Sequence, residues 1–348
     1  MTPPLREGGI IMHMADALLS PVVGGVFWIA GGALIGYSAK KIREEHDMVK
    51  TPLMGVLGAF VFAAQMINFT IPGTGSSGHL GGGLLLAVLL GPYRAFITLA
   101  SVLIIQCLFF ADGGLLALGC NLINLAFFPA FIAFPFIYRV IAGNSASPGK
   151  LAAGSMMAAT AGLLMGALSV VLETLFSGIT ELPFRTFVLF MLPIHLAIGL
   201  VEGLVTWGVL VFVSRTDPAL LVPAKSSVRP HFSFALFAIL ALLTGGAGSW
   251  FASSQPDGLE WSIAKVSGSE AFRPADEPVH EALAAFQQKI AFLPDYGFKS
   301  GPESRTGSAS PVKAATSLAG IVGSLSVLAA AGAIGLVLRR KRQEQEDV

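Results

Sequence analysis

The sequence predicts an all-α polytopic membrane protein, and three observations lead to this fold class. Of the 348 residues, 54% are hydrophobic and only 12% are charged, whereas a soluble domain carries about 25% charged residues. Several apolar runs approach or exceed the roughly 20 residues that cross a bilayer. Basic residues gather in alternate loops between these runs, as the positive-inside rule requires. The runs are 20–39, 52–70, 79–92, 94–111, 115–139, 151–177, 186–213, 231–251 and 315–338.

Nine spans bring all basic clusters to one side of the membrane if the N-terminus is outside. We therefore expect a multi-pass protein of the cell (inner) membrane with an extracytoplasmic N-terminus and a cytoplasmic C-terminus. The third run is short and Gly-rich, so we expect a broken or tilted span there. The clusters that set this orientation are Lys40–Lys50, Arg94, Arg139–Lys150, Arg215–Arg229 and Arg339–Arg342.

The linker 214–230 marks a domain boundary because it is basic and contains prolines. Before it, residues 12–213 form a predicted seven-span unit. After it, residues 231–348 form a predicted two-span module that encloses the outer segment 252–314. Within that segment, 278–292 has apolar residues at helical spacing and predicts one amphipathic helix, whereas the Ser/Gly/Pro-rich stretch 299–312 predicts a flexible tether.

The stretch Met12-His13 can form a metal chelate if Met12 is the working N-terminus. A free amine, the amide nitrogen of His13 and its imidazole can hold one cation, and a second imidazole would complete four nitrogens in a plane. His79, in a Gly-rich loop predicted on the same outer side, is the natural fourth donor. Tetragonal nitrogen coordination suits Ni(II) or Cu(II). The plainer alternative is two ordinary loop histidines.

Residues 1–11 are interpreted as an over-extended start. Codons for Glu7-Gly8-Gly9 are purine-rich and can resemble a ribosome-binding site at a normal distance before the Met12 codon. The alternative is a genuine short extension, which would need trimming or would abolish the chelate.

Several polar residues in or near the spans are candidates for supporting the site or for coupling, because such side chains usually face the bundle interior. Asp16 could hydrogen-bond His13 or cap the first span. His195 and Glu202 lie two helical turns apart on one face of the seventh predicted span. Either they take part in substrate binding or coupling, or they form a hydrogen bond between helices. The same choice between supporting the site and joining helices applies to Gln65, Asn68, Gln106, Asn121 and Asn124.

Other polar side chains are expected to be less informative. Glu173 is expected at the membrane interface, and His231 and His280 are interpreted as isolated interfacial or surface residues. Cys107 and Cys120 lack metal-site spacing and are interpreted as small buried residues.

The sequence also excludes some functions and leaves two alternatives open. A net charge of +1 gives no indication of a nucleic-acid partner, and the chain has neither an ATP-binding G-x-x-x-x-G-K-[ST] motif nor the zincin motif H-E-x-x-H. One alternative is an intramembrane serine hydrolase with Ser77 and His195 as its dyad. The other is an ion-gradient-driven metal carrier that uses Glu202 and Glu173.

Several stretches resemble the M component of nickel/cobalt energy-coupling-factor (ECF) transporters, the CbiM/NikM family. The resemblance covers 12–213, and a tail similar to the N component, with the signature Pro-Asp-Gly-Leu-Glu at 256–260, follows it. The chain therefore looks like a fusion of the two components. The matching stretches are Met12–Asp16 with Leu19–Pro21, Phe62–Phe69, Ile71–Thr74 with Ser77–Gly82, Asp112–Gly114, Ala117–Gly119 with Asn121 and Asn124, and Pro193–His195 with Gly199 and Glu202–Gly203.

The resemblance implies a substrate-binding membrane subunit that imports Ni²⁺ or Co²⁺, for cobalamin biosynthesis or for nickel enzymes. Its metal ligands would be the Met12 amine, the His13 amide and imidazole, and His79. The loop before His79 is slightly longer than the family's Gly-Gly-Thr-Ser-Gly-His form.

The family's partners are a transmembrane coupling (T/Q) component and cytoplasmic ATPases (A/O). ATP hydrolysis belongs to those partners, so we expect no enzyme activity and no catalytic cofactor in this chain. The N-like module is implied to assist metal loading. Nitrogen-rich, planar coordination favours nickel slightly, and because the ligands must lose protons, binding is expected to weaken as pH falls.

Overall fold

The computed structural model describes residues 13–45, 50–143, 147–221, 231–268, 278–298 and 309–346. Met12 and the extension before it, residues 222–230 of the predicted linker 214–230, and most of the predicted tether therefore lie outside the described residues. The described part is almost entirely helical, with one two-stranded antiparallel sheet. This confirms the all-α fold class.

Six helical stretches are long and apolar enough to cross a membrane, which confirms a multi-pass membrane protein. They are Pro21–Glu44, Pro92–Phe110, Leu118–Ala142, Pro148–Ser177, Phe184–Thr216 and Ala314–Leu338. Two further predicted spans are helices of 16 residues each, α2 and α9. The total of nine spans stays a prediction.

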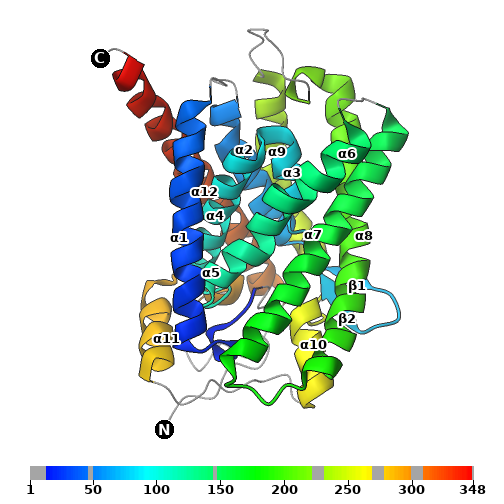
Figure 1. Ribbon diagram of the computed structural model, residues 1–348, viewed down its shortest axis with the longest axis vertical. Coiled ribbons are helices and arrows are strands. Elements are labelled where there is room, and N and C mark those ends of the chain that lie inside the picture. Colours follow the sequence, from blue (N-terminus) through cyan, green and yellow to red (C-terminus); the bar gives the residue numbers. More distant parts are fainter. Residues whose placement is uncertain are drawn as a thin grey trace.

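The elements follow one another along the chain as Figure 1 shows. The helices are η1 Asp16–Leu18, α1 Pro21–Glu44, α2 Lys50–Gln65, α3 Gly83–Leu90, α4 Pro92–Phe110, α5 Leu118–Asn121, the π-helix η2 Leu122–Tyr138, α6 Arg139–Ala142, α7 Pro148–Ser177, α8 Phe184–Thr216, η3 Pro218–Leu220, α9 His231–Gly246, η4 Gly248–Phe251, α10 Gly258–Ser267, α11 Pro278–Ile290, η5 Pro294–Tyr296 and α12 Ala309–Glu346, and the strands are β1 Phe69–Ile71 and β2 Ser76–Gly78.

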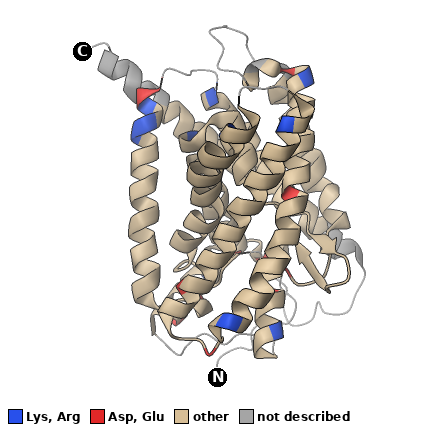
Figure 2. Ribbon diagram, turned by 45° about the vertical axis from the view of Figure 1, so that its right-hand side comes forward, with Lys and Arg blue, Asp and Glu red and all other residues tan. Residues whose placement is uncertain are grey.

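Charged residues lie mostly at the two ends of the helices, and the middle of the molecule is largely free of them (Figure 2). This distribution is what a bilayer requires, because charges at its centre are costly. Exposed apolar side chains on the long helices, such as Ile29, Leu189 and Leu204, are consistent with contact to lipid.

The third predicted span, 79–92, is broken, as expected: a hairpin precedes it, its first residues are extended, and its helix α3 is short. Strands β1 and β2 pair with Phe69 opposite Gly78, and α3 has only eight residues. Such a helix is about 12 Å long, whereas the hydrocarbon core is about 30 Å thick. The chain therefore enters this side of the bundle as an extended segment, and His79 lies on that segment between β2 and α3.

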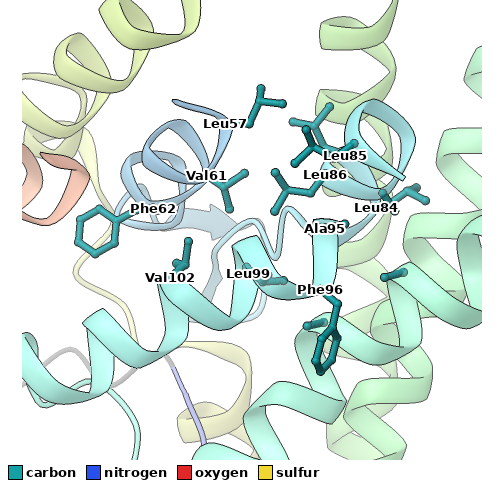
Figure 3. Close-up of a cluster of buried hydrophobic side chains, with 14 of the residues drawn as sticks. Leu57, Val61, Phe62, Leu84, Leu85, Leu86, Ala95, Phe96, Leu99 and Val102 are labelled. Atoms are coloured by element: carbon teal, nitrogen blue, oxygen red, sulfur yellow. The ribbon is translucent and has the colours of Figure 1, made fainter. Parts of the chain in front are cut away.

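Helices α2, α3 and α4 pack against each other behind this segment. Their buried side chains interlock around Phe62 and Phe96 (Figure 3). This apolar core gives the loop that carries His79 a rigid support.

The C-terminal module packs against the first unit. Helices α9 and α12 both pack on α2. Gly55 of α2 lies against Gly332 of α12, and within the module Gly245 of α9 touches Gly320 of α12, so small residues allow close approach at both contacts. Helix α11 confirms the amphipathic helix predicted at 278–292, whereas α10 was not predicted. Both helices lie at the end of the molecule where α1 begins (Figure 1).

Candidate metal centre

The segment that carries His13 is an extended strap held by the loop before α5 and by α5 itself. Asn121 binds both backbone groups of Met14, accepting from its N–H at 3.1 Å and donating to its carbonyl at 3.2 Å. Gly114 N–H donates to the same carbonyl at 3.0 Å. Both His13 and Met14 are buried. The strap is therefore fixed in position although it has no regular secondary structure of its own at these residues.

Asp16 has a different role from the two that the sequence suggested. Its Oδ1 accepts from Ala117 N–H at 2.9 Å, and burial raises the pKa of its carboxyl group. The cap of α1 is Ser20, whose side chain accepts from Val23 N–H. Asp16 thus anchors the strap to the start of α5, and neither contacts His13 nor caps the first span.

The segment that carries His79 is clamped by side chains from α2 and α8. The carboxyl group of Glu202 accepts from Gly81 N–H at 2.9 Å and from Gly82 N–H at 3.0 Å. Gln65 donates to the Gly81 carbonyl at 2.9 Å, and Gln106 donates to Gln65 at 2.9 Å. The side chains of Glu202 and Gln65 therefore support the His79 segment through its backbone.

The two segments bring His13 and His79 together. Their ring centroids are 5.5 Å apart and the rings are inclined by 64°. Both rings line a cavity of about 60 Å³, which exceeds the roughly 10–15 Å³ that one water molecule needs. His195 of α8, Asn121 and Asp257 line the same cavity. Three imidazoles thus line one cavity at the N-terminal strap, although the described residues contain no group of three or more His, Cys, Asp or Glu side chains placed to hold a metal ion.

His13 is buried without ordinary hydrogen-bond partners. Its Nδ1 lies 3.1 Å from Asp112 Oδ2, but the contact is not aligned as a hydrogen bond, and within the described residues neither ring nitrogen makes one. Buried polar atoms are normally paired, so unpaired imidazole nitrogens beside a cavity fit a site for a cation. Burial, together with the nearby His13, lowers the pKa of His79 to about 3, and its ring is therefore neutral and able to act as a ligand.

Residues of the C-terminal module contact the loop beside the strap and form part of the cavity wall. Tyr296 donates its hydroxyl to Asp112 Oδ2 at 2.6 Å, and burial raises the pKa of Tyr296, so it keeps its proton. Gln287 donates to the Gly113 carbonyl at 2.7 Å. Asp257, which caps α10 by accepting from Glu260 N–H at 2.9 Å, lies on the cavity wall. The contacts of Tyr296 and Gln287 were not predicted, because they join residues far apart in the chain.

Ser77 and His195 do not form the dyad that a serine hydrolase would need. Ser77 donates its hydroxyl to the Gln255 carbonyl at 2.7 Å, and Nδ1 of His195 lies 2.8 Å from the Met191 carbonyl. In the described hydrogen-bond network, each of these two side chains has a backbone partner and neither is bonded to the other. Ser77 instead joins β2 to the segment before α10.

Two sequence-based interpretations are wrong. Glu173 is not interfacial, because only 2% of it is exposed and it accepts from Asn124 and Ser169. His280 is not a surface residue, since it is 3% exposed and its Nε2 lies 2.8 Å from the Leu19 carbonyl. Periodicity alone could not show that other elements cover these positions.

The structure also shows the surroundings of Asn68 and of the two free cysteines. The Asn68 carbonyl accepts from Ser253 N–H at 2.7 Å, which links the end of α2 to the C-terminal module. Cys107 and Cys120 are both buried and unpaired with each other, as expected.

Comparison with known proteins identifies the family. The family model described as "Cobalt uptake substrate-specific transmembrane region" (CbiM) matches residues 13–220. The chain belongs to this family. A second family model, the PDGLE domain, matches residues 232–340. Together these matches confirm the resemblance to a CbiM/NikM component fused to a PDGLE module.

Relatives in this family are named as transport proteins, not as enzymes. The chain is 33% identical to the "Putative fused nickel transport protein NikMN" of Archaeoglobus fulgidus, over 94% of this chain and 98% of that protein. It is 31% identical to the "Fused nickel transport protein NikMN" of Rhodobacter capsulatus, over 67% of this chain and 70% of that protein. It is 28% identical to the "Cobalt transport protein CbiM" of Geobacter sulfurreducens, over 76% and 80%, respectively.

A solved structure shows the same architecture. The crystal structure titled as that of a transition metal transporter matches with a TM-score of 0.51 and 29% sequence identity, over 65% of this chain and 99% of that chain. The match extends the family relationship to the three-dimensional fold.

Proposed function

We propose that the chain is the substrate-binding membrane subunit of an ECF-type importer for Ni²⁺ or Co²⁺. The observation that carries this proposal is the meeting of His13 and His79, held on two separately clamped segments, at one cavity. The names of the relatives support transition-metal transport, and both metals occur among them.

The proposed ligand set is the Met12 amine, the His13 amide nitrogen, His13 Nδ1 and one nitrogen of His79. Nδ1 is the ring nitrogen of His13 that can close a six-membered chelate ring with its own amide nitrogen. Met12 lies outside the described residues, so its part rests on this chemistry and on the start proposed at Met12. The N-terminus is proposed to face outward, and the metal would then enter from outside the cytoplasm.

Transport requires the site to release what it binds. We assign this step to partner subunits, a transmembrane coupling component and cytoplasmic ATPases, which would reorient the seven-span unit 12–213. The two-span module 231–348 would cover the outer face of the site during loading. The metal is the transported substrate here, and the chain itself carries no catalytic step.

The test combines the N-terminus with metal content. Protein purified from membranes is examined by intact mass and by metal analysis of the same sample. We expect a chain that begins at Met12 and holds about one metal ion, and loss of that ion in both His13→Ala and His79→Ala.

His231→Ala is the matched control, because it removes an imidazole at the start of α9, a helix that contributes none of the described residues around the cavity. Equal metal content in the wild type and both ligand variants would defeat the site. A mature chain that begins at Met1 would defeat the chelate. Uptake that persists in cells lacking any ATPase partner would favour an ion-gradient-driven carrier.

A further inference from the structure

Helix α11 is fastened to the bundle by polar side chains. Nε2 of the buried His280 lies 2.8 Å from the Leu19 carbonyl and 3.1 Å from the Asp16 carbonyl, just before α1. Gln287, which is also buried, donates to the Gly113 carbonyl at 2.7 Å. Seven residues separate His280 from Gln287, so both side chains lie on one face of the helix. This polar face therefore holds the backbone of the strap and of the loop that follows α4.

A second face of α11 is apolar and exposed. Val279 and Phe286 are also seven residues apart, and they are 44% and 54% exposed. Ile290 lies one turn further along the same row. Each residue turns a helix by about 100°, so the exposed polar residues Glu281 and Gln288 lie on the far side of the helix from Phe286. The helix thus has one side on the bundle, one apolar side and one polar side.

The second half of α11 lies at the depth of a membrane span. Gln287 also donates to the Cys107 carbonyl at 3.0 Å, and Phe292 N–H donates to the Phe109 carbonyl at 3.2 Å. Both acceptors belong to the last turn of α4, a helix long and apolar enough to cross a membrane. Phe286 precedes Gln287 directly, and it therefore lies level with the end of this span.

The apolar face of α11 continues the lipid-facing surface of the bundle. Helix α11 lies beside the start of α1 (Figure 1), where Val22 and Val26 are exposed. The connection between α7 and α8 lies at the same end (Figure 1), and Phe176 and Phe184 beside it are exposed as well. Exposed aromatic and aliphatic side chains at one end of a bundle of spans are typical of the boundary between hydrocarbon and water. The bilayer is therefore the neighbour that this face meets.

We propose that α11 inserts its Val279–Phe286 face into the bilayer at this end of the bundle, which is the outer leaflet in the proposed orientation. The lipid thereby keeps the polar face of α11 on the strap. The part of the phospholipid that is bound is the acyl chains and not the headgroup, because α11 carries one acidic and one basic residue, Glu281 and Lys289, whose charges cancel. This inference goes beyond the proposed function, because it concerns how the C-terminal module meets the membrane and holds for either metal.

The first experiment measures lipid contact by tryptophan fluorescence. The purified full-length chain is placed in lipid discs of phosphatidylcholine, either plain or brominated on the acyl chains, because bromine quenches a tryptophan that it touches. The variant is Phe286→Trp, and the matched control is Gln288→Trp on the far side of the same helix. The wild-type signal, which comes from four tryptophans, is subtracted from both.

The added tryptophan of Phe286→Trp is expected to lose most of its emission in brominated discs, whereas that of Gln288→Trp keeps most of its emission. Equal quenching of the two, or no quenching of Phe286→Trp, would overturn the inference and leave this face to a protein partner or a second copy. If Phe286→Trp fails to fold, Val279→Trp on the same face takes its place and is judged in the same way.

The second experiment measures the hold on the strap by hydrogen exchange of the amides of residues 13–19 in plain discs without added metal. Phe286→Asp places a charge on the apolar face, and these amides are expected to exchange about tenfold faster or more, because the helix loses the apolar surroundings of one phenylalanine side chain. Gln288→Asp is the matched control and is expected to exchange like the wild type. Unchanged exchange in Phe286→Asp, or equal acceleration in both variants, would refute the hold on the strap.

Discussion

Replacement of Glu202 by glutamine tests whether the His79 segment is positioned through its backbone. The carboxyl group of Glu202 accepts from two consecutive amides, Gly81 at 2.9 Å and Gly82 at 3.0 Å, and is buried in the bundle. Glutamine retains one acceptor oxygen but presents an NH₂ group to the other amide. One buried N–H therefore loses its partner and meets a second donor.

The magnitude follows from that single loss. A buried donor left without a partner costs about 1–3 kcal/mol, so the free energy of unfolding of Glu202→Gln should fall by roughly that amount. Because His79 lies two residues before Gly81, displacement of this segment moves a ligand. If the same free energy is lost from metal binding, the affinity falls about tenfold or more, since 1.4 kcal/mol corresponds to a factor of ten.

Glu173→Gln is the matched control for this experiment. Glu173 is an equally buried carboxyl group, but its partners are the side chains of Asn124 and Ser169, not the His79 segment. Thermal unfolding and Ni²⁺ titration are measured for both variants in detergent. The reasoning is refuted if Glu202→Gln is destabilised yet binds nickel like the wild type, or if Glu173→Gln loses nickel to the same extent.

Three further predictions concern the strap, the turn before α3 and pH. Asn121→Ala removes both hydrogen bonds to Met14 and should lower metal affinity by about tenfold, measured by chelator competition; unchanged affinity would show that the strap needs no clamp. Gly82→Ala should lower the free energy of unfolding by about 1–3 kcal/mol, because φ is +74° and the new Cβ would lie 2.6 Å from Val61. Adding Val61→Ala to the same chain should restore only the part of the stability that is lost to the clash with Val61. Burial lowers the pKa of His79 to about 3 from 6.5, so as pH falls the unfolded chain takes up a proton on this ring before the folded chain does. The free energy of unfolding of the metal-free protein should therefore fall as pH decreases from about 6.5 toward 3, by at most about 1.4 kcal/mol per pH unit. The same pH series on His79→Gln should show a shallower slope.

Long apolar helices could be predicted from the sequence because hydropathy is summed over many residues. The expected run 151–177 corresponds to α7, Pro148–Ser177, and 186–213 corresponds to α8, Phe184–Thr216. The hairpin of β1 and β2 was missed since each strand has only three residues, too few for an alternating pattern. Helix α10 was missed because its first residues, Gly258–Glu260, belong to the Pro-Asp-Gly-Leu-Glu signature, which was used only to identify the module.

The candidate ligand positions could be proposed from the sequence, whereas the residues that support them could not. His13 and His79 stand out as histidines in polar outer segments of an apolar chain. Asp112 and Tyr296 form a hydrogen bond across 184 positions, and no local pattern indicates such a pairing. Glu202 was identified as a polar residue inside a span, but its partners are backbone amides, and an amide carries no signal in the sequence.

The supports give the site a property that suits the proposed import of a metal ion. His13 is held through Met14 by Asn121 of α5, whereas His79 is held through Gly81 and Gly82 by Glu202 of α8. The two imidazoles are thus held by different helices, α5 and α8, and the distance between them depends on how these helices are placed. Because packed helices shift between discrete arrangements by 1–2 Å or more, and productive ligand geometry tolerates only about 0.5 Å, a modest movement of α8 against α5 is sufficient to separate the ligands. A high metal affinity in one arrangement and a low affinity in another would then follow from where the clamps are attached, without any change in the ligands themselves.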